Sequence, residues 1–141
     1  MRKLVCAALL LAACSDPLGS GGVRVLPEQE AYAAFNDTQP VTVRYTVTNA
    51  DDAPIGVPIC GSTLSVQIQR KVNGEWATVA APGTSCFAVF ALRTIDPGRS
   101  VTDSVTVQGF GTWRVRVPFT RPQSESGFAD SREFVTRVPP D

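Results

Sequence analysis

From residue 23 onward, apolar and polar side chains alternate with a period of two. In VTVRYTVTN the apolar side chains Val41, Val43, Tyr45 and Val47 fall on one face, and threonine and arginine fall on the other. Such alternation in β-branched residues predicts half-buried β-strands. The same pattern predicts further strands at residues 64–68, 101–107 and 113–119, and shorter ones at 23–26, 76–79 and 134–138.

Turn-forming residues separate these segments. Asn73-Gly74 is the strongest short signal for a β-hairpin, and residues 49–54 and 96–98 have the composition of turns. No window has the periodicity of a long helix, and residues 31–35 fit one helical turn or an edge strand. We therefore expect an all-β fold, an antiparallel β-sandwich of seven to nine strands. A barrel is the alternative, and the uneven strand lengths and the prolines at strand ends favour the sandwich.

The first residues, MRKLVCAALLLAAC, have the order of a secretory signal: two cations, a short apolar run and small residues before the cleavage point. Leu11-Ala12-Ala13-Cys14 resembles the bacterial lipobox at every position. The resemblance implies cleavage after Ala13 and lipidation of Cys14. An ordinary cleaved signal with a chance cysteine is the alternative. The expected organisation is a signal peptide at 1–13, a lipidated cysteine and tether at 14–22, and a sandwich at 23–141.

Attached acyl chains would hold the mature chain at a membrane, since two or more chains give stable anchoring. Ser15 follows the lipidated cysteine, and this resembles the proteobacterial pattern for delivery to the outer membrane. We expect a lipid-anchored protein of the bacterial cell envelope, facing the periplasm or the cell surface. The glycine- and serine-rich segment 15–22 is a short tether that keeps the domain close to the membrane.

The composition argues against most catalytic chemistry. The chain has no histidine, which excludes Ser-His-Asp and Cys-His catalysis and histidine-ligated metals. Nucleophile-elbow, phosphate-loop and Cys-x-x-Cys motifs are also absent from the sequence. We expect no enzyme and no cofactor. Removing Arg2 and Lys3 with the signal leaves 13 − 2 = 11 cations against 13 anions, a net charge of −2, and such a balance predicts no nucleic-acid partner.

Two cysteines remain after Cys14, at Cys60 and Cys86. Export would place them in an oxidising compartment, where such a pair usually forms a disulfide. Closing a loop of this length stabilises the folded state by about 3–4 kcal/mol on the chain-entropy estimate. Two free thiols or a metal site are the alternatives.

Several strands together resemble a known family. VTVRYTVTN, APIGV, PGRS and GTWRVRV are similar to immunoglobulin-like domains of bacterial surface lipoproteins, and to the BsuPI-type proteinase inhibitor domain. The resemblance covers residues 23–138 and implies an immunoglobulin-like sandwich. The Cys60–Cys86 separation is shorter than the inter-sheet pair of true immunoglobulin domains. No reactive-loop residues match those of an inhibitor, so inhibition is not carried over.

Some side chains are candidates for binding. Residues 87–92 are apolar on both faces, which fits a central strand; the sharper hypothesis is an exposed partner surface through Phe87, Val89 and Ala91. Other candidates have an ordinary and a functional interpretation. Arg44, Arg114 and Arg116 fit a solvated face or an anion site, Asp51-Asp52 fits a turn or a calcium site, and Trp76 and Trp113 fit the core, with Trp76 packed on the disulfide.

These features together predict a non-enzymatic protein-binding or assembly module at the envelope, with another envelope protein as its partner. One alternative is a lipoprotein that binds a cell-wall or carbohydrate ligand, and the other is a protease inhibitor of the BsuPI type. An exposed apolar patch or free sheet edge would favour the first, a concave pocket with convergent polar groups the second, and a protruding rigid loop the third.

Overall fold

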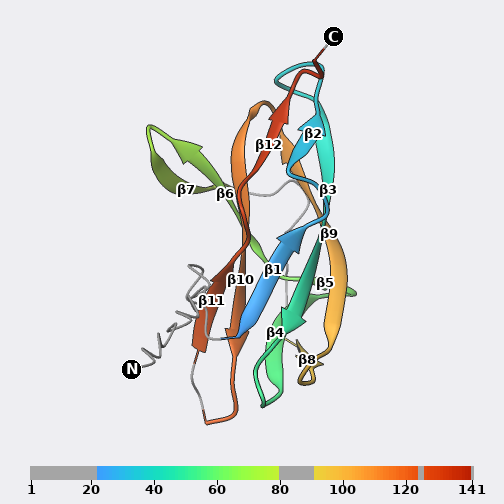
Figure 1. Ribbon diagram of the computed structural model, residues 1–141, viewed down its shortest axis with the longest axis vertical. Helices are drawn as coiled ribbons and strands as arrows, with labels where there is room; N and C mark the ends of the chain where they lie inside the picture. Colours follow the sequence, from blue (N-terminus) through green and yellow to red (C-terminus); the bar gives the residue numbers. More distant parts are fainter. Residues whose placement is uncertain (1–21, 80–90, 124–125, 141) are drawn as a thin grey trace, which may run out of the picture.

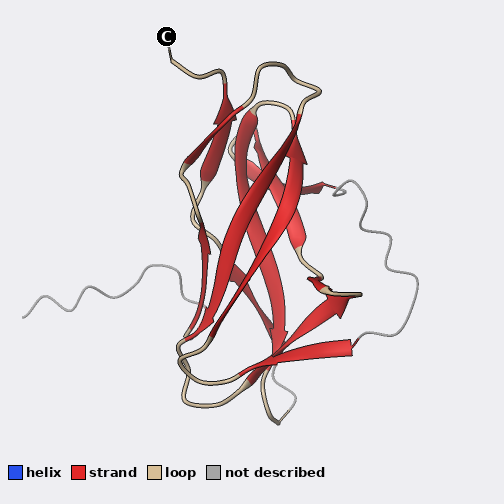
Figure 2. Ribbon diagram, turned by 90° about the vertical axis from the view of Figure 1, so that its right-hand side faces the viewer, coloured by secondary structure: helices blue, strands red, loops and turns tan. Residues whose placement is uncertain are grey.

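The computed structural model describes residues 22–79, 91–123 and 126–140, which form an all-β fold (Figures 1 and 2). The strands are β1 (Val23–Pro27), β2 (Ala31–Ala33), β3 (Pro40–Asn49), β4 (Ile55–Cys60), β5 (Thr63–Leu64), β6 (Gln67–Val72), β7 (Glu75–Val79), β8 (Ala91–Ile95), β9 (Ser100–Gln108), β10 (Gly111–Thr120), β11 (Ser126–Asp130) and β12 (Phe134–Arg137). This part of the chain contains no helix that could span a membrane.

Two separate sheets enclose one core, so the predicted sandwich is confirmed. The smaller sheet has the order β1-β3-β9, and β10 is the central strand of the larger sheet. Pairing is antiparallel except between β12 and β2. Apolar side chains from both sheets make the core, among them Val43 and Val47 from β3 and Val115 and Val117 from β10.

The expected seven to nine strands are exceeded, because the described residues form twelve. The long strand β10 pairs with β11 and β12 along one side and with β6 and β4 along the other. Two short strands therefore stand on each side of β10, where a single long strand would otherwise pair with it. The single strand predicted at 64–68 is divided in the same way. Ser65 donates its backbone N–H to the Pro58 carbonyl (2.8 Å), which holds β5 beside β4 before the chain moves to β10.

The Asn73-Gly74 hairpin is confirmed. Asn73 and Gly74 both have positive φ angles, of 52° and 86°, as a type I′ turn requires. The turn sets Val72 opposite Glu75 and Trp76 opposite Lys71. Residues 31–33 form an edge strand, which decides between the two interpretations of that segment.

Asn49, in the predicted turn at 49–54, is fully buried. Its side-chain amide donates to the carbonyls of Ala53 (2.8 Å) and Ile95 (2.9 Å), and its side-chain oxygen accepts from the Asp51 backbone N–H. One side chain thus satisfies three backbone groups and connects the turn to β8.

Tyr45 is buried in the core at 1% exposure, and its hydroxyl has no hydrogen-bond partner among the described residues. Burial raises the pKa of Tyr45 well above its ordinary value, and the nearby Asp103 carboxylate raises it further. Tyr32, the only other tyrosine, also has a raised pKa, chiefly through burial.

These raised values predict a loss of stability at alkaline pH. Below the unfolded-state pKa of about 10, neither tyrosine titrates in either state, and the stability is intact. Above it, only the unfolded state releases protons, so each tyrosine removes up to about 1.4 kcal/mol of stability per pH unit. Tyr45→Phe should make this decline shallower and should not destabilise the protein at neutral pH. Denaturant titrations of both proteins at several pH values check this, and a decline equal to that of the parent chain would contradict it.

Candidate functional site

Most of the predicted site residues lie outside the described residues. Cys14, Cys86, Phe87 and Val89 are among them. Cys60 is the last residue of β4 and is partly exposed. Lipidation of Cys14 and the Cys60–Cys86 disulfide therefore remain predictions.

Ala91 is the only described residue of the predicted partner surface. It is exposed at the start of β8, and the adjacent Leu92 is 52% exposed. Among the described strands, β8 pairs with β4 alone. A central strand covered on both faces is therefore wrong for Ala91 and Leu92, because β8 lies at a sheet edge. Leu92 packs on Gly56 of β4, where an added Cβ would lie 3.1 Å from the Leu92 side chain.

The larger sheet carries a row of cations and aromatic rings on its outer surface. We call this row the cation–aromatic face and define it by Lys71, Trp76, Arg114, Arg116 and Phe128. These residues come from β6, β7, β10 and β11, and the β6–β7 hairpin projects from the body of the domain in Figure 1. Strand pairing sets Trp76 opposite Lys71, Gln69 opposite Arg114 and Arg116 opposite Asp130, so side chains from four strands share one surface.

Arg114 is the most constrained residue of this face. Its guanidinium lies 4.4 Å from the centre of the Trp76 ring. Its Nε donates to the Gln69 side-chain oxygen (2.7 Å), and its Nη1 lies 3.0 Å from Asp130. Three partners on three strands leave the guanidinium little freedom, so the surface is organised before any partner binds.

Arg116 and Lys71 extend the face on either side of Arg114. Arg116 lies 4.5 Å from the Phe128 ring centre and 3.4 Å from the same Asp130 carboxylate. Lys71 lies 5.4 Å from the Trp76 ring centre and donates to Glu133 (2.9 Å). Phe128 is 47% exposed.

The two tryptophans differ. Trp113 is buried, as predicted, and donates its indole N–H to Thr136 (2.9 Å). Trp76 is partly exposed, so its assignment to the core is wrong. The hairpin register places it opposite the outward Lys71, and β7 pairs with β6 alone among the described strands. Reading the register from the Asn-Gly turn, instead of from the apolar character of tryptophan, could have found this residue.

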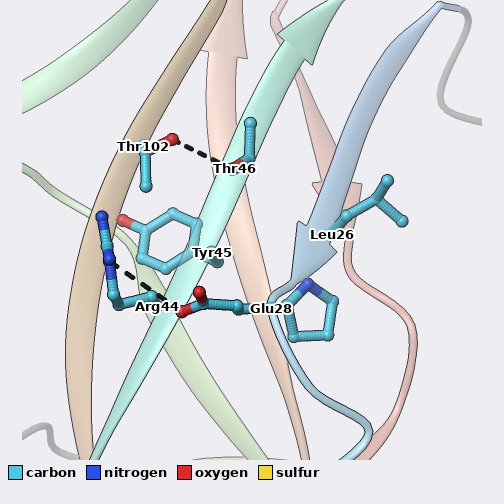
Figure 3. Close-up of a pocket in the computed structure, with 7 residues that line it drawn as sticks. Leu26, Glu28, Arg44, Tyr45, Thr46 and Thr102 are labelled. Carbon is cyan, nitrogen blue, oxygen red and sulfur yellow. Dashed lines mark hydrogen bonds and ion pairs between the residues drawn. The ribbon is translucent and has the colours of Figure 1, made fainter.

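Arg44 belongs to a different surface, on the smaller sheet. There a shallow groove of about 440 Å³ is lined by Leu26, Pro27, Glu28, Arg44, Tyr45, Thr46 and Thr102 (Figure 3). Arg44 and Glu28 approach to 3.9 Å while both side chains stay more than half exposed. The hydroxyls of Thr46 and Thr102 are 3.0 Å apart. The three arginines proposed together as an anion site are thus divided between two sheets.

Asp51 has a structural role. Its carboxylate accepts from the Arg121 Nε at 2.8 Å. No group of three or more acidic or cysteine side chains that could hold a metal occurs within residues 22–79, 91–123 and 126–140. Asp51 and Asp52 lie in the bend between β3 and β4.

The sequence patterns do not identify Asp103 as a residue with a structural role. It lies on the inner face of β9, in the positions otherwise occupied by Val101, Val105 and Val107. Its carboxylate accepts the backbone N–H of Leu64 (2.5 Å) and of Ser104 (2.7 Å). An inward charge on an edge strand hinders pairing with a further strand, so β9 is a poor docking edge.

Comparison with known proteins supports the fold and assigns no family. No family model matches the chain, and no curated protein matches it. The chain is similar to the X-ray structure of the Northeast Structural Genomics Consortium target SoR45, with 14% identity, a TM-score of 0.52, and coverage of 85% of this chain and 89% of that one. It is equally similar to the putative ApaA protein from Bordetella pertussis, with 14% identity, a TM-score of 0.51, and coverage of 83% and 90%.

These two matches support the overall arrangement of strands in the all-β fold. A further match, at a TM-score of 0.45 and 9% identity, is an ASH/PapD-like domain of human CEP192, with coverage of 97% of this chain and 98% of that one. At these identities the likeness concerns the arrangement of strands alone. The binding surface has to be argued from this chain's own residues.

Proposed function

We propose that this chain is a lipid-anchored lipoprotein of the bacterial envelope whose sandwich is a non-enzymatic protein-binding module. The cation–aromatic face carries the proposal. Tryptophan and arginine are the residue types that most often dominate protein–protein binding energy, and here they stand on four hydrogen-bonded strands. A surface ordered before binding loses less conformational entropy when a partner docks.

The geometry of Trp76 favours a protein over a glycan. Sugars bind aromatic residues by stacking on an open ring face. Arg114 and Lys71 already lie over the Trp76 ring, at 4.4 and 5.4 Å from its centre. The face thus combines the partly exposed Trp76 with cations and, on β11, the half-exposed Phe128, a mixture suited to a protein surface.

A ligand-binding lipoprotein is the second candidate function. The groove on the smaller sheet combines the exposed Leu26 with the opposite charges of Glu28 and Arg44, and a cell-wall or carbohydrate fragment would bind there. The groove is shallow and would bury little of a small ligand, whereas small-molecule sites usually enclose most of the ligand surface.

The BsuPI-type inhibitor alternative has less support. Among the described residues, the β6–β7 hairpin projects from the domain, and its tip is the tight Asn73-Gly74 turn. A protease cleft binds an extended chain, which a two-residue type I′ turn cannot supply.

Site-directed photo-cross-linking in the native envelope tests the proposed function. Gln67 is exposed on β6 opposite Arg116, next to the cation–aromatic face. Ser104 is exposed on the smaller sheet and is the matched control. A photo-reactive residue at position 67 should trap one dominant protein that position 104 does not trap. The same products from both positions, or none from position 67, would contradict a protein-binding role for this face.

Intact mass spectrometry tests the proposed anchor and disulfide. Protein extracted from membranes and kept non-reduced should lack residues 1–13, carry acyl chains on Cys14 and show no free thiol. A Cys14→Ala variant should lose the acyl mass and leave the membrane fraction, because one lost attachment point removes every chain. An unlipidated soluble product with two reactive thiols would contradict both parts of the proposal.

A further inference from the structure

Within the described residues, the cation–aromatic face has more positive than negative charge. Lys71, Arg114 and Arg116 supply three cations, and their ion-pair partners Asp130 and Glu133 supply two carboxylates. The full chain has 13 cations and 13 anions, so the face is more positive than the chain as a whole. A partner that matches this face electrostatically carries negative charge.

Of the two arginines of this face, Arg116 has the longer carboxylate contact and the more exposed side chain. It shares Asp130 with Arg114, whose contact with that carboxylate is shorter, at 3.0 Å against 3.4 Å. The Nε of Arg116 and the Oδ1 of Asp130 are close, yet neither has a hydrogen-bond partner among the described residues. The Arg116 Nε is buried, whereas the side chain as a whole is 32% exposed, so an incoming carboxylate would have to reach the Nη atoms. A carboxylate suits it because guanidinium donors match carboxylate oxygens in a bidentate arrangement.

Apolar surface lies beside this cation. Phe128 is 47% exposed, and Arg116 is stacked on its ring. The face extends over β7, β6, β10 and β11, a width of roughly 14 Å at the usual spacing between neighbouring strands. This width is suited to a short segment of a protein that combines acidic side chains with an apolar one.

We propose that the cation–aromatic face binds an acidic segment of its protein partner, with Asp or Glu side chains on Arg116 and an adjacent apolar side chain against Phe128. This inference rests on the proposed protein-binding function and adds the chemistry of the partner. Anionic lipid is the competing occupant, because phosphate also pairs with arginine.

Selection from an unbiased peptide library tests the proposal. The full chain, in detergent micelles, is the target of a phage-displayed random peptide library. The selected sequences should be enriched in Asp and Glu next to aliphatic or aromatic residues. Arg116→Gln should weaken the strongest peptide about tenfold, the usual effect of removing a charged hydrogen-bond partner. Arg116→Lys, which keeps the charge, should lose less, and Arg44→Gln on the other sheet should bind as the parent chain does.

Other outcomes would overturn the proposal. Neutral or basic selected peptides, or acidic peptides that bind equally well to Arg116→Gln, would exclude the acidic segment. Co-sedimentation with phosphatidylglycerol vesicles that depends on Arg116, without binding of acidic peptides, would assign the face to a membrane surface. If the selected peptides are neutral and position 67 still traps a protein, the proposed acidic segment is contradicted while the protein-binding function stands. No protein trapped from that position would contradict the proposed function itself.

Discussion

Phe134→Ala should lower the free energy of unfolding by about 3–5 kcal/mol, the usual effect of truncating a fully buried aromatic side chain. Phe134 is 0% exposed and begins β12. Its ring meets the Tyr32 ring edge-on, with centroids 5.6 Å apart, and this contact connects the edge strand β2 to the core. Removal leaves a cavity between the two strands and loses the aromatic contact.

Equilibrium denaturation checks this result, with Phe35→Ala as the matched control. Phe35 is 69% exposed just beyond β2, so its truncation should change stability by no more than about 0.5 kcal/mol. Equal effects of the two variants would contradict the assignment of Phe134 to the core.

Trp76→Ala should weaken binding of the protein partner about 30-fold, which corresponds to about 2 kcal/mol for an interface hot spot. Trp76 contributes a large ring at the outer strand of the cation–aromatic face and holds Arg114 by stacking at 4.4 Å. The truncation removes both the ring and one constraint on Arg114. Because Trp76 is already partly exposed, we expect it to cost only about 1 kcal/mol of folding stability.

Val72→Ala is the control for this second prediction. Val72 is 48% exposed on the same hairpin, and alternation along β6 places it on the face opposite to Lys71. It should bind the partner as the parent chain does. Affinity is measured by titrating the partner identified by cross-linking from position 67. Equal losses in both variants would mean that the hairpin acts only as a spacer.

Much of the fold could be predicted from the sequence because strand alternation and turn chemistry are local. The β3 pattern of Val41, Val43, Tyr45 and Val47 predicts which residues are buried, and the Asn73-Gly74 turn predicts a hairpin in register. The division into twelve strands could not be predicted in this way. The number of strands depends on how much longer β10 is than each strand that pairs with it, and this is a property of the assembled sheet.

The candidate site was harder to predict, since a site depends on which residues meet across strands. Strand alternation predicts that Arg114 and Arg116 face outward, but Asp130, which contacts both, comes from the strand after the next turn. The apolar character of tryptophan predicts a core position for Trp76, whereas the hairpin register places its ring on the outer surface. Asp103 interrupts the apolar alternation of β9, and that interruption was the signal that could have revealed its role at the sheet edge.

Hydroxyl-radical footprinting of intact cells against the purified chain tests most directly whether the cation–aromatic face is covered by a partner. If a partner covers this face, Trp76 and Phe128 are oxidised more slowly in cells than in the purified chain, while the exposed Phe35 reacts equally in both. Equal oxidation of Trp76 and Phe128 in the two settings would show that the face is uncovered in the envelope and would contradict the account.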